Sequence, residues 1–279
     1  MSLLIPEVFA DAINAKLDTT IRIGRVAFDA TSLVPEILTM GDTVHFPTFN
    51  RVAVAESVTK GTELTPKTVD MTDSQAPIKW IGSAVRVYDQ EAAQIKGAVV
   101  DQMAIQVAEA MAKKIDNDLT VALDTDIAYK AASAAGDAIT AAEIESGFAK
   151  FGDSIDTAGF AGIVINSRLL PSFYAMPEFT STQLTYQTNG NGIVTNGIIG
   201  LYRGIPVLVC DNGTYDSGKK ECKTYIVKVG ALGYVFQRNI KIEEDRQGLL
   251  LATDIIASSL YATKLVDSTG AVVVRKTIV

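Results

Sequence analysis

Residues 89–124 carry an apolar residue at every fourth position, and this spacing predicts one long α-helix. Each step of four residues advances ~40° around a helix, so the apolar stripe spirals instead of staying on one face. Two interpretations stay open: different stretches of the helix meet different partners, or the helix is buried on several sides. The stripe consists of Ile95, Val99, Met103, Val107, Met111, Ile115, Leu119 and Leu123.

Alternating apolar residues predict strands on both sides of this helix. Residues 41–49 alternate Val44, Phe46 and Thr48, and Pro47 marks them as an edge strand because proline has no N–H to donate. A capping box at residues 140–143 predicts the start of a further helix. Residues 249–266 are ambiguous because both of their faces are partly apolar. Further strands are predicted at residues 78–87, 162–165, 205–210, 224–229, 240–244 and 271–278.

The segment between the first two strands, residues 50–75, has alternating valines but almost nothing large to bury. A segment of this length without a core of its own is unusual inside a compact domain. We therefore expect an extended hairpin that projects from the body and needs a partner surface. Its candidate contact residues with a neighbouring subunit are Arg51, Val52, Val54, Glu56, Val58, Lys60, Glu63 and Lys67.

Composition places the chain among folded globular proteins. It has 279 residues, is 48% hydrophobic and 20% charged, and can therefore build a sizeable core. The net charge is −7 and no cationic run exceeds two residues, which argues against a nucleic-acid-binding stripe. No apolar run reaches the length of a membrane helix, and the first residues lack the cationic start of a signal peptide.

A glycine-rich stretch raises the question of a nucleotide site. Residues 213–219 match the first seven positions of the phosphate-binding loop, but Lys220 replaces the Ser or Thr that would bind Mg²⁺. The residues after it alternate like a strand and do not start a helix, so we expect a hairpin turn. Cys210 and Cys222 flank this turn; a disulfide between them is possible, but we expect free thiols in a reducing cytosol.

No set of residues points to catalysis. His45 is the single histidine, and a lone strand histidine cannot form a metal cluster. The acidic pairs at residues 116–118 and 124–126 lack the glycine and distal glutamate of a calcium loop, so we interpret them as solvated caps. Trp80 is expected to be a packing residue. We predict no enzyme activity, no cofactor and no metal.

The order of these parts resembles the major capsid proteins of tailed bacteriophages, which have the Hong Kong phage-type capsid fold. IPEVFADAINAKL resembles the N-terminal arm of this family, and GDTVHFPTF the opening of its projecting loop. KWIGSAVRVYDQEAAQ is similar to the return of that loop into the long "spine" helix. GLYRGIPVLVCD resembles a strand pair of the axial domain, and DIIASSLYATKLVDSTGAVVVRKTIV the closing strands of the peripheral domain.

The resemblance implies an α+β capsid fold with four parts. Residues 1–40 are expected to form the N-terminal arm, and residues 41–88 the projecting hairpin, called the E-loop, with its base strands. Residues 89–130 and 240–279 would form the peripheral domain around the spine helix, and residues 131–239 the axial α/β domain.

The implied function is that of a structural subunit of an icosahedral phage head. The subunits would assemble as pentamers and hexamers around packaged double-stranded DNA, without binding a specific sequence. A separate scaffolding protein and a portal are expected partners, the virion the final location, and the host cytoplasm the place of assembly. Two alternatives stay open: the shell protein of a non-viral nanocompartment with the same fold, and a soluble α/β enzyme that binds phosphate through residues 213–219.

Overall fold

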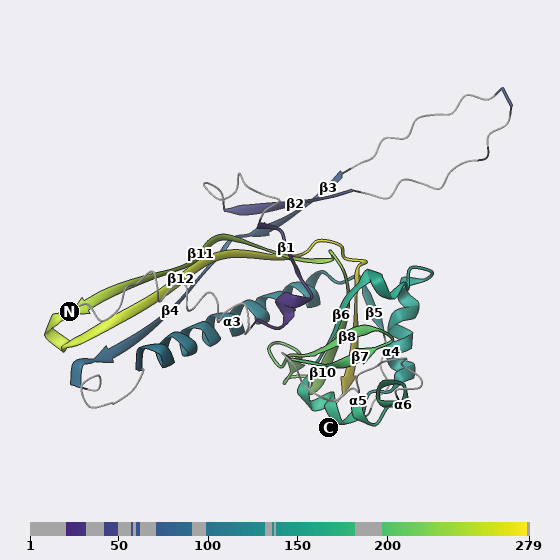
Figure 1. The fold of residues 1–279 in the computed structure, drawn as a ribbon. Coiled ribbons are helices and arrows are strands. Elements are labelled where there is room, and N and C mark those ends of the chain that lie inside the picture. Colours follow the sequence, from purple (N-terminus) through teal and green to yellow (C-terminus); the bar gives the residue numbers. More distant parts are fainter. Residues whose placement is uncertain are drawn as a thin grey trace.

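Two β-sheets and one long helix make up the body of the protein (Figure 1). The structure is a computed structural model. It describes residues 21–31, 42–49, 57, 60–61, 71–90, 99–131, 136, 138–181 and 197–277. The stretch IPEVFADAINAKL, which resembles the N-terminal arm, lies outside the described residues.

The first sheet has four strands in the order β1-β11-β12-β4. They are β1 (Phe28–Asp29), β11 (Leu232–Gln247), β12 (Ala252–Leu265) and β4 (Lys79–Tyr88). Strands β11 and β12 form a long antiparallel hairpin, closed by the 3₁₀ turn η7 (Gly248–Leu250). The ambiguous segment at residues 249–266 is therefore mostly strand.

The second sheet has seven strands. The tip of the long β11–β12 hairpin is at one end of the molecule, and the second sheet lies at the other end (Figure 1). Six follow the order β5-β13-β10-β6-β8-β7, and a short β9 pairs with β10. The strands are β5 (Tyr129–Ala131), β6 (Phe160–Ile165), β7 (Ile198–Tyr202), β8 (Ile205–Val209), β9 (Tyr215–Asp216), β10 (Glu221–Lys228) and β13 (Ala271–Thr277). The strands predicted at residues 162–165, 205–210 and 224–229 are confirmed.

Strand β13 pairs with β5 and β10 in the seven-stranded sheet, whereas the resemblance groups residues 240–279 around the spine helix. The physical reason is burial, since Ala271, Val272, Val273 and Val274 are all fully buried. A strand buried on both faces belongs inside a covered sheet, whereas the outward-facing residues of β4, at the edge of the four-stranded sheet, are exposed. The four-part division of the chain as such stays a prediction.

Helix α3 (Val99–Asp126) connects the two sheets. One core cluster combines its residues Val107, Met111 and Leu119 with Tyr261 of the first sheet and Tyr225 of the second. The predicted end of the helix, near residue 124, is confirmed. The predicted start at residue 89 stays a prediction, because residues 91–98 lie outside the described residues.

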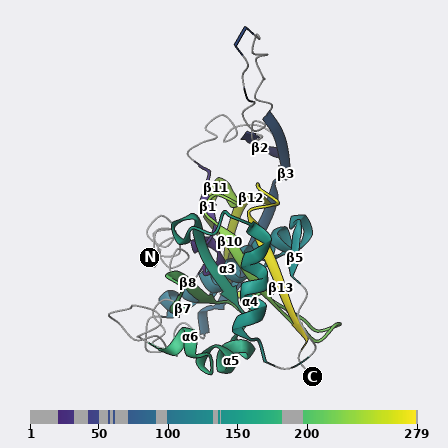
Figure 2. The ribbon, with the colours of Figure 1, turned by 90° about the vertical axis from the view of Figure 1, so that its right-hand side faces the viewer.

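The opposite face of the seven-stranded sheet is covered by short helices (Figure 2). The capping box that begins α4 (Ala141–Phe148) is confirmed, because the Thr140 N–H donates to Glu143 Oε2 over 2.8 Å. The buried Lys276 Nζ donates to Glu143 Oε1 over 2.6 Å and so ties α4 to β13. The other helical segments described are η1 (Ile23–Arg25), η4 (Ala149–Phe151), η5 (Thr157–Gly159), η6 (Ser167–Leu169), α5 (Leu170–Tyr174) and α6 (Pro177–Thr180).

A third, small cluster lies under the hairpin of β2 (Thr43–Phe49) and β3 (Met71–Pro77). Val44, Phe46 and Ala76 of the hairpin pack there against Val235 of β11 and Ala262 of β12. Strand β12 therefore has apolar neighbours on both faces, and this explains why its sequence pattern is ambiguous. None of the helices described is long and apolar enough to span a bilayer.

Candidate subunit interface

The paired strands β2 and β3 lead away from the body toward the predicted contact loop (Figure 1). One face of this hairpin is held by the small core cluster, and on the other His45 Nδ1 lies 2.5 Å from Asp73 Oδ2. Between the strands, Lys60 is exposed and forms a turn with Gly61, whose φ is +94°. The other seven candidate contact residues, Arg51, Val52, Val54, Glu56, Val58, Glu63 and Lys67, lie outside the described residues. The contact hypothesis therefore stays a prediction.

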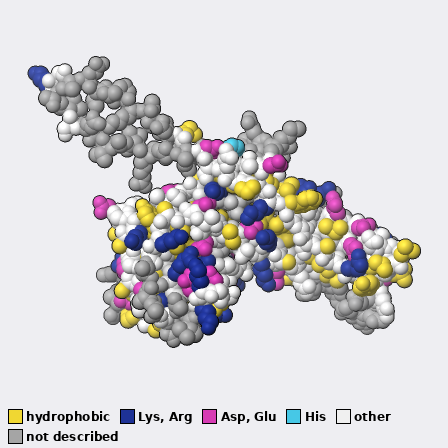
Figure 3. All heavy atoms as spheres, turned by 180° about the vertical axis from the view of Figure 1, so that it is seen from behind, with side chains coloured by type: hydrophobic (Ala, Val, Ile, Leu, Met, Phe, Trp, Pro, Cys, Tyr) yellow, Lys and Arg dark blue, Asp and Glu magenta, His cyan; other side chains and the backbone are white. Residues whose placement is uncertain are grey.

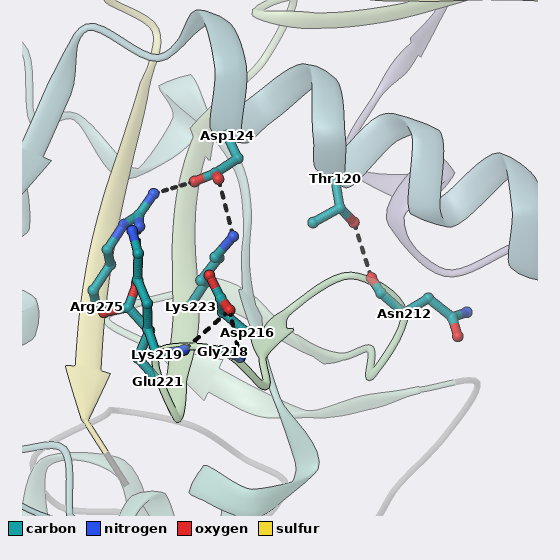
Figure 4. A network of polar contacts seen from close by, with 9 residues as sticks. All are labelled: Thr120, Asp124, Asn212, Asp216, Gly218, Lys219, Glu221, Lys223 and Arg275. Atoms are coloured by element: carbon teal, nitrogen blue, oxygen red, sulfur yellow. Dashed lines mark hydrogen bonds and ion pairs between the residues drawn. The ribbon is translucent and has the colours of Figure 1, made fainter.

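The glycine-rich stretch that resembles a phosphate-binding loop is a hairpin turn (Figure 4). Asp216 Oδ1 accepts hydrogen bonds from the N–H groups of Gly218 over 2.9 Å and Lys219 over 3.2 Å. The turn leads into β10 and not into a helix, so its amides do not form the N-terminal phosphate cradle of a helix. Because the acceptor Asp216 already occupies these amides, the hairpin prediction is confirmed.

Gly213 of the same stretch serves packing against α3. Its φ is +73°, and a Cβ placed there would lie 2.9 Å from the Cβ of Thr120 and 3.0 Å from Asn117 Oδ1. Thr120 Oγ1 in turn donates to the carbonyl of Asn212 over 3.0 Å (Figure 4). The glycine is thus needed because the turn touches the helix, not because a nucleotide approaches it.

The acidic pairs on α3 join the helix to other elements, which corrects their interpretation as solvated caps. Asp118 is buried and accepts hydrogen bonds from Tyr261 Oη over 2.6 Å and Lys114 Nζ over 3.0 Å. Burial alone would raise the pKa of Asp118, but these hydrogen bonds and the charges of Lys79 and Lys114 outweigh it and lower the pKa. Asp126 pairs with Lys264 over 2.8 Å.

Asp124 connects α3 to the seven-stranded sheet (Figure 4). It accepts hydrogen bonds from Lys223 Nζ over 2.9 Å and from Arg275, which also donates to Glu221 Oε1 over 2.8 Å. Asp118 and Asp124 therefore bind different sheets from the same helix. This arrangement favours the interpretation in which successive stretches of the spiralling helix meet different partners.

Asp116 holds residues 22–23 of the predicted N-terminal arm. The carboxylate is buried, and its Oδ1 accepts from the backbone N–H groups of Arg22 over 3.2 Å and Ile23 over 3.0 Å. Arg22 also donates to the carbonyl of Val209 over 3.1 Å. Burial raises the pKa of Asp116, and the backbone hydrogen bonds offset this only in part. Residues 22–23 are thereby fixed where α3 meets the seven-stranded sheet.

Cys210 and Cys222 are free and buried. They belong to two different core clusters, Cys210 to the one with α3 and Cys222 to the one with α4. Burial and then the charge of Asp116 raise the pKa of Cys210 to about 12. Among the residues that the structure describes, no group of three or more acidic, His or Cys side chains could hold a metal ion.

Trp80 is not the packing residue that we expected. It is 75% exposed, because it lies on the outward face of β4 while its neighbour Ile81 points into the core.

A second exposed apolar group was not predicted at all. Leu249, Leu250 and Leu251 form the tip of the β11–β12 hairpin, and hydrophobic side chains gather at this end of the molecule (Figure 3). The signal for this tip was a run of three leucines directly after Gln247-Gly248, in a turn where polar residues are usual.

Comparisons with known proteins agree with this architecture. A family model described as "Phage capsid protein" matches residues 72–274. The comparison with curated proteins found no match. Among solved structures, a chain from Mycobacterium phage Che8 is 18% identical, with a TM-score of 0.67 and 89% of each chain covered.

Two further solved structures share the fold. One is described as the capsid structure of the Cyanophage P-SCSP1u, with 14% identity, a TM-score of 0.62, and 86% of this chain and 85% of the other covered. The other is described as the capsid of an empty GTA particle. It has 10% identity, a TM-score of 0.67, and 92% and 90% of the two chains covered.

Proposed function

Since this chain belongs to the phage capsid protein family, it is a structural subunit of a phage head and not an enzyme, and we propose that it assembles as pentamers and hexamers around double-stranded DNA. Two of the solved structures with the same fold are described as capsids, which supports self-association as the central activity of this chain. The virion is its location.

The observation that carries the finer proposal is the anchoring of the β2–β3 hairpin. Among the described residues, the hairpin is fixed to its own subunit at the base, where Val44, Phe46 and Ala76 are buried. The sequence beyond the base offers few large apolar residues. We expect this loop to gain its burial on a neighbouring subunit, with its valines against that surface and its charges in exposed pairs. Each exposed ion pair contributes only ~0.2–1 kcal/mol, so such contacts become effective when many act together on a closed shell.

The DNA is enclosed rather than bound tightly. A net charge of −7 gives no general attraction to a polyanion, and a weak attraction suits a shell that must accept densely packed DNA. A scaffolding protein and a portal complete the proposed set of partners, and the host cytoplasm is the proposed place of assembly.

The test is to replace residues 50–70 by a short Gly-Ser turn, which leaves the paired strands β2 and β3 intact. Shortening a loop costs the subunit little entropy. We therefore expect a folded subunit that melts like the parent but forms no shells in electron micrographs, with the scaffold present. A length-preserving control neutralises only the charged residues among the candidate contacts, by the changes R51Q, E56Q, K60Q, E63Q and K67Q.

Two results would count against the proposed contact of this loop with a neighbouring subunit. Normal shells from the shortened variant would make the loop dispensable, and an unfolded subunit would make it part of the core. The cargo of parental shells tests the rest of the proposal, since protein instead of DNA inside them would indicate a non-viral compartment.

A further inference from the structure

The tip of the β11–β12 hairpin exposes three consecutive leucines. Leu249 is fully exposed, and Leu250 and Leu251 are 52% and 64% exposed. Leu251 also has a φ of +49°, a left-handed conformation that costs free energy for a residue with a Cβ. An exposed apolar group on a strained backbone is typical of a site whose partner is not present in the isolated subunit.

An apolar hollow lies beside β4 on the same subunit. Its volume is about 360 Å³, and its lining includes Trp80, Gly82, Ala110 and Met111. Strand β4 is the outer strand of its sheet, and none of the strands described covers this side. The hollow therefore has an apolar wall and an exposed indole beside an open sheet edge.

The tip cannot reach the hollow of its own subunit. Leu251 adjoins Ala252, which pairs with Tyr88 at the far end of β4, whereas Trp80 lies eight residues back along that strand. At ~3.3 Å per residue the two sites are ~26 Å apart. The register between β4 and β12 runs without interruption over this distance, so the strands do not fold back on themselves.

The charges around the two sites are complementary. Lys114 lines the hollow, and Lys79 precedes Trp80 in the chain; the two share one carboxylate, Asp118, with Nζ–O distances of 3.0 and 3.3 Å. Near the tip, Glu244 and Asp245 carry negative charge, and within the described part of the chain no cation forms an ion pair with them. The hollow is thus surplus in positive charge and the tip in negative charge.

We propose that the leucine tip of one subunit inserts into the Trp80 hollow of a second copy of this chain. The two surfaces differ, so the contact is heterologous and can either close as a ring or continue as a lattice. This inference rests on the proposed self-assembly and adds which surfaces meet.

The test places the photo-crosslinking residue p-benzoylphenylalanine at position 80. A minority of labelled copies is assembled with an excess of heavy-isotope parental copies, so that the parental chain carries shell formation and any crosslink between copies is recognised by mass. We expect irradiated shells to yield the heavy tryptic peptide of residues 247–264 joined to position 80. The same label at Val229, which is 63% exposed and lies outside both surfaces, should not yield it.

The double variant L249S/L250S gives a second measurement, with V229S as its matched control. We expect the tip variant to melt like the parent, to lose the crosslink at position 80 and to form at least tenfold fewer shells, while V229S assembles normally. A crosslink to residues 52–60 or to the N-terminal peptide would overturn the proposal, and so would normal shells from the tip variant. If the parental chain itself forms no shells, that result contradicts the proposed assembly. If the parental chain forms shells but the label at position 80 gives no crosslink to residues 247–264, the result contradicts the pairing of the two surfaces.

Discussion

Adding one methyl group at Gly213 should destabilise the subunit by ~2–4 kcal/mol. In Gly213→Ala, a φ of +73° costs an L-residue about 1 kcal/mol. The new Cβ would also lie 2.9 Å from Thr120, and overpacking of this kind costs roughly 1–3 kcal/mol more. Thr120 cannot easily withdraw, because it is buried and its hydroxyl lies 2.8 Å from the carbonyl oxygen of Asp116 and 3.0 Å from that of Asn212.

Thermal unfolding of the unassembled subunit measures this loss, and Gly230→Ala is the matched control. Gly230 has a similar φ of +79° but nothing within 4 Å of its Cβ position, so only the conformational cost of about 1 kcal/mol remains. At about 2 °C per kcal/mol for a chain of this size, Tm should fall by ~4–8 °C in the first variant and by ~2 °C in the second. Equal losses in the two variants would refute the idea that contact with α3 selects glycine at position 213.

Three further predictions concern the helix and the turn. Val107→Asp should lower the free energy of unfolding by about 4 kcal/mol, because Val107 is only 1% exposed. The control Val121→Asp, on the same helix but 49% exposed, should cost less than about 1 kcal/mol. Similar Tm values for the two variants would contradict this burial pattern. Asp118→Asn should lose about 1–3 kcal/mol at pH 7. Because the pKa of Asp118 is lowered in the folded state, its ionisation stabilises the fold above its ordinary pKa of 3.8, and this stability is lost as the pH falls. In urea unfolding, the difference in unfolding free energy between Asp118→Asn and the parent should therefore shrink below pH ~4. A difference that stays constant with pH would contradict this prediction. Calorimetric titration with ATP and Mg²⁺ should give no saturable heat, because Asp216 already accepts from the amides of the turn; sub-millimolar binding would contradict the hairpin assignment.

Much of the fold could be predicted because local patterns were clear. Strand β4 and the turn at Gly218 follow from alternation and turn residues, and α4 from its capping box. Each of these signals acts over a few neighbouring residues. Tertiary contacts strengthen the elements but did not change their type.

The errors arose where long-range packing decides. The pattern around Trp80 shows an alternating strand, but only the position of α3 determines that Ile81 is covered and Trp80 is not. The sheet to which β13 belongs depends on pairing with β5, more than a hundred residues earlier in the chain. The carboxylates of α3 form contacts with residues as distant as Arg275, so their spacing alone resembled solvated caps.

The separation of the two cysteines gives the subunit a pair of built-in kinetic probes. Cys210 and Cys222 are its only thiols, each is fully buried, and each belongs to a different core cluster. A thiol reagent can modify Cys210 only when the cluster around α3 opens, and Cys222 only when the cluster around α4 opens. The two modification rates, resolved by mass spectrometry of the tryptic peptides, therefore time the opening of the two sides of the seven-stranded sheet independently, in free subunits and in shells.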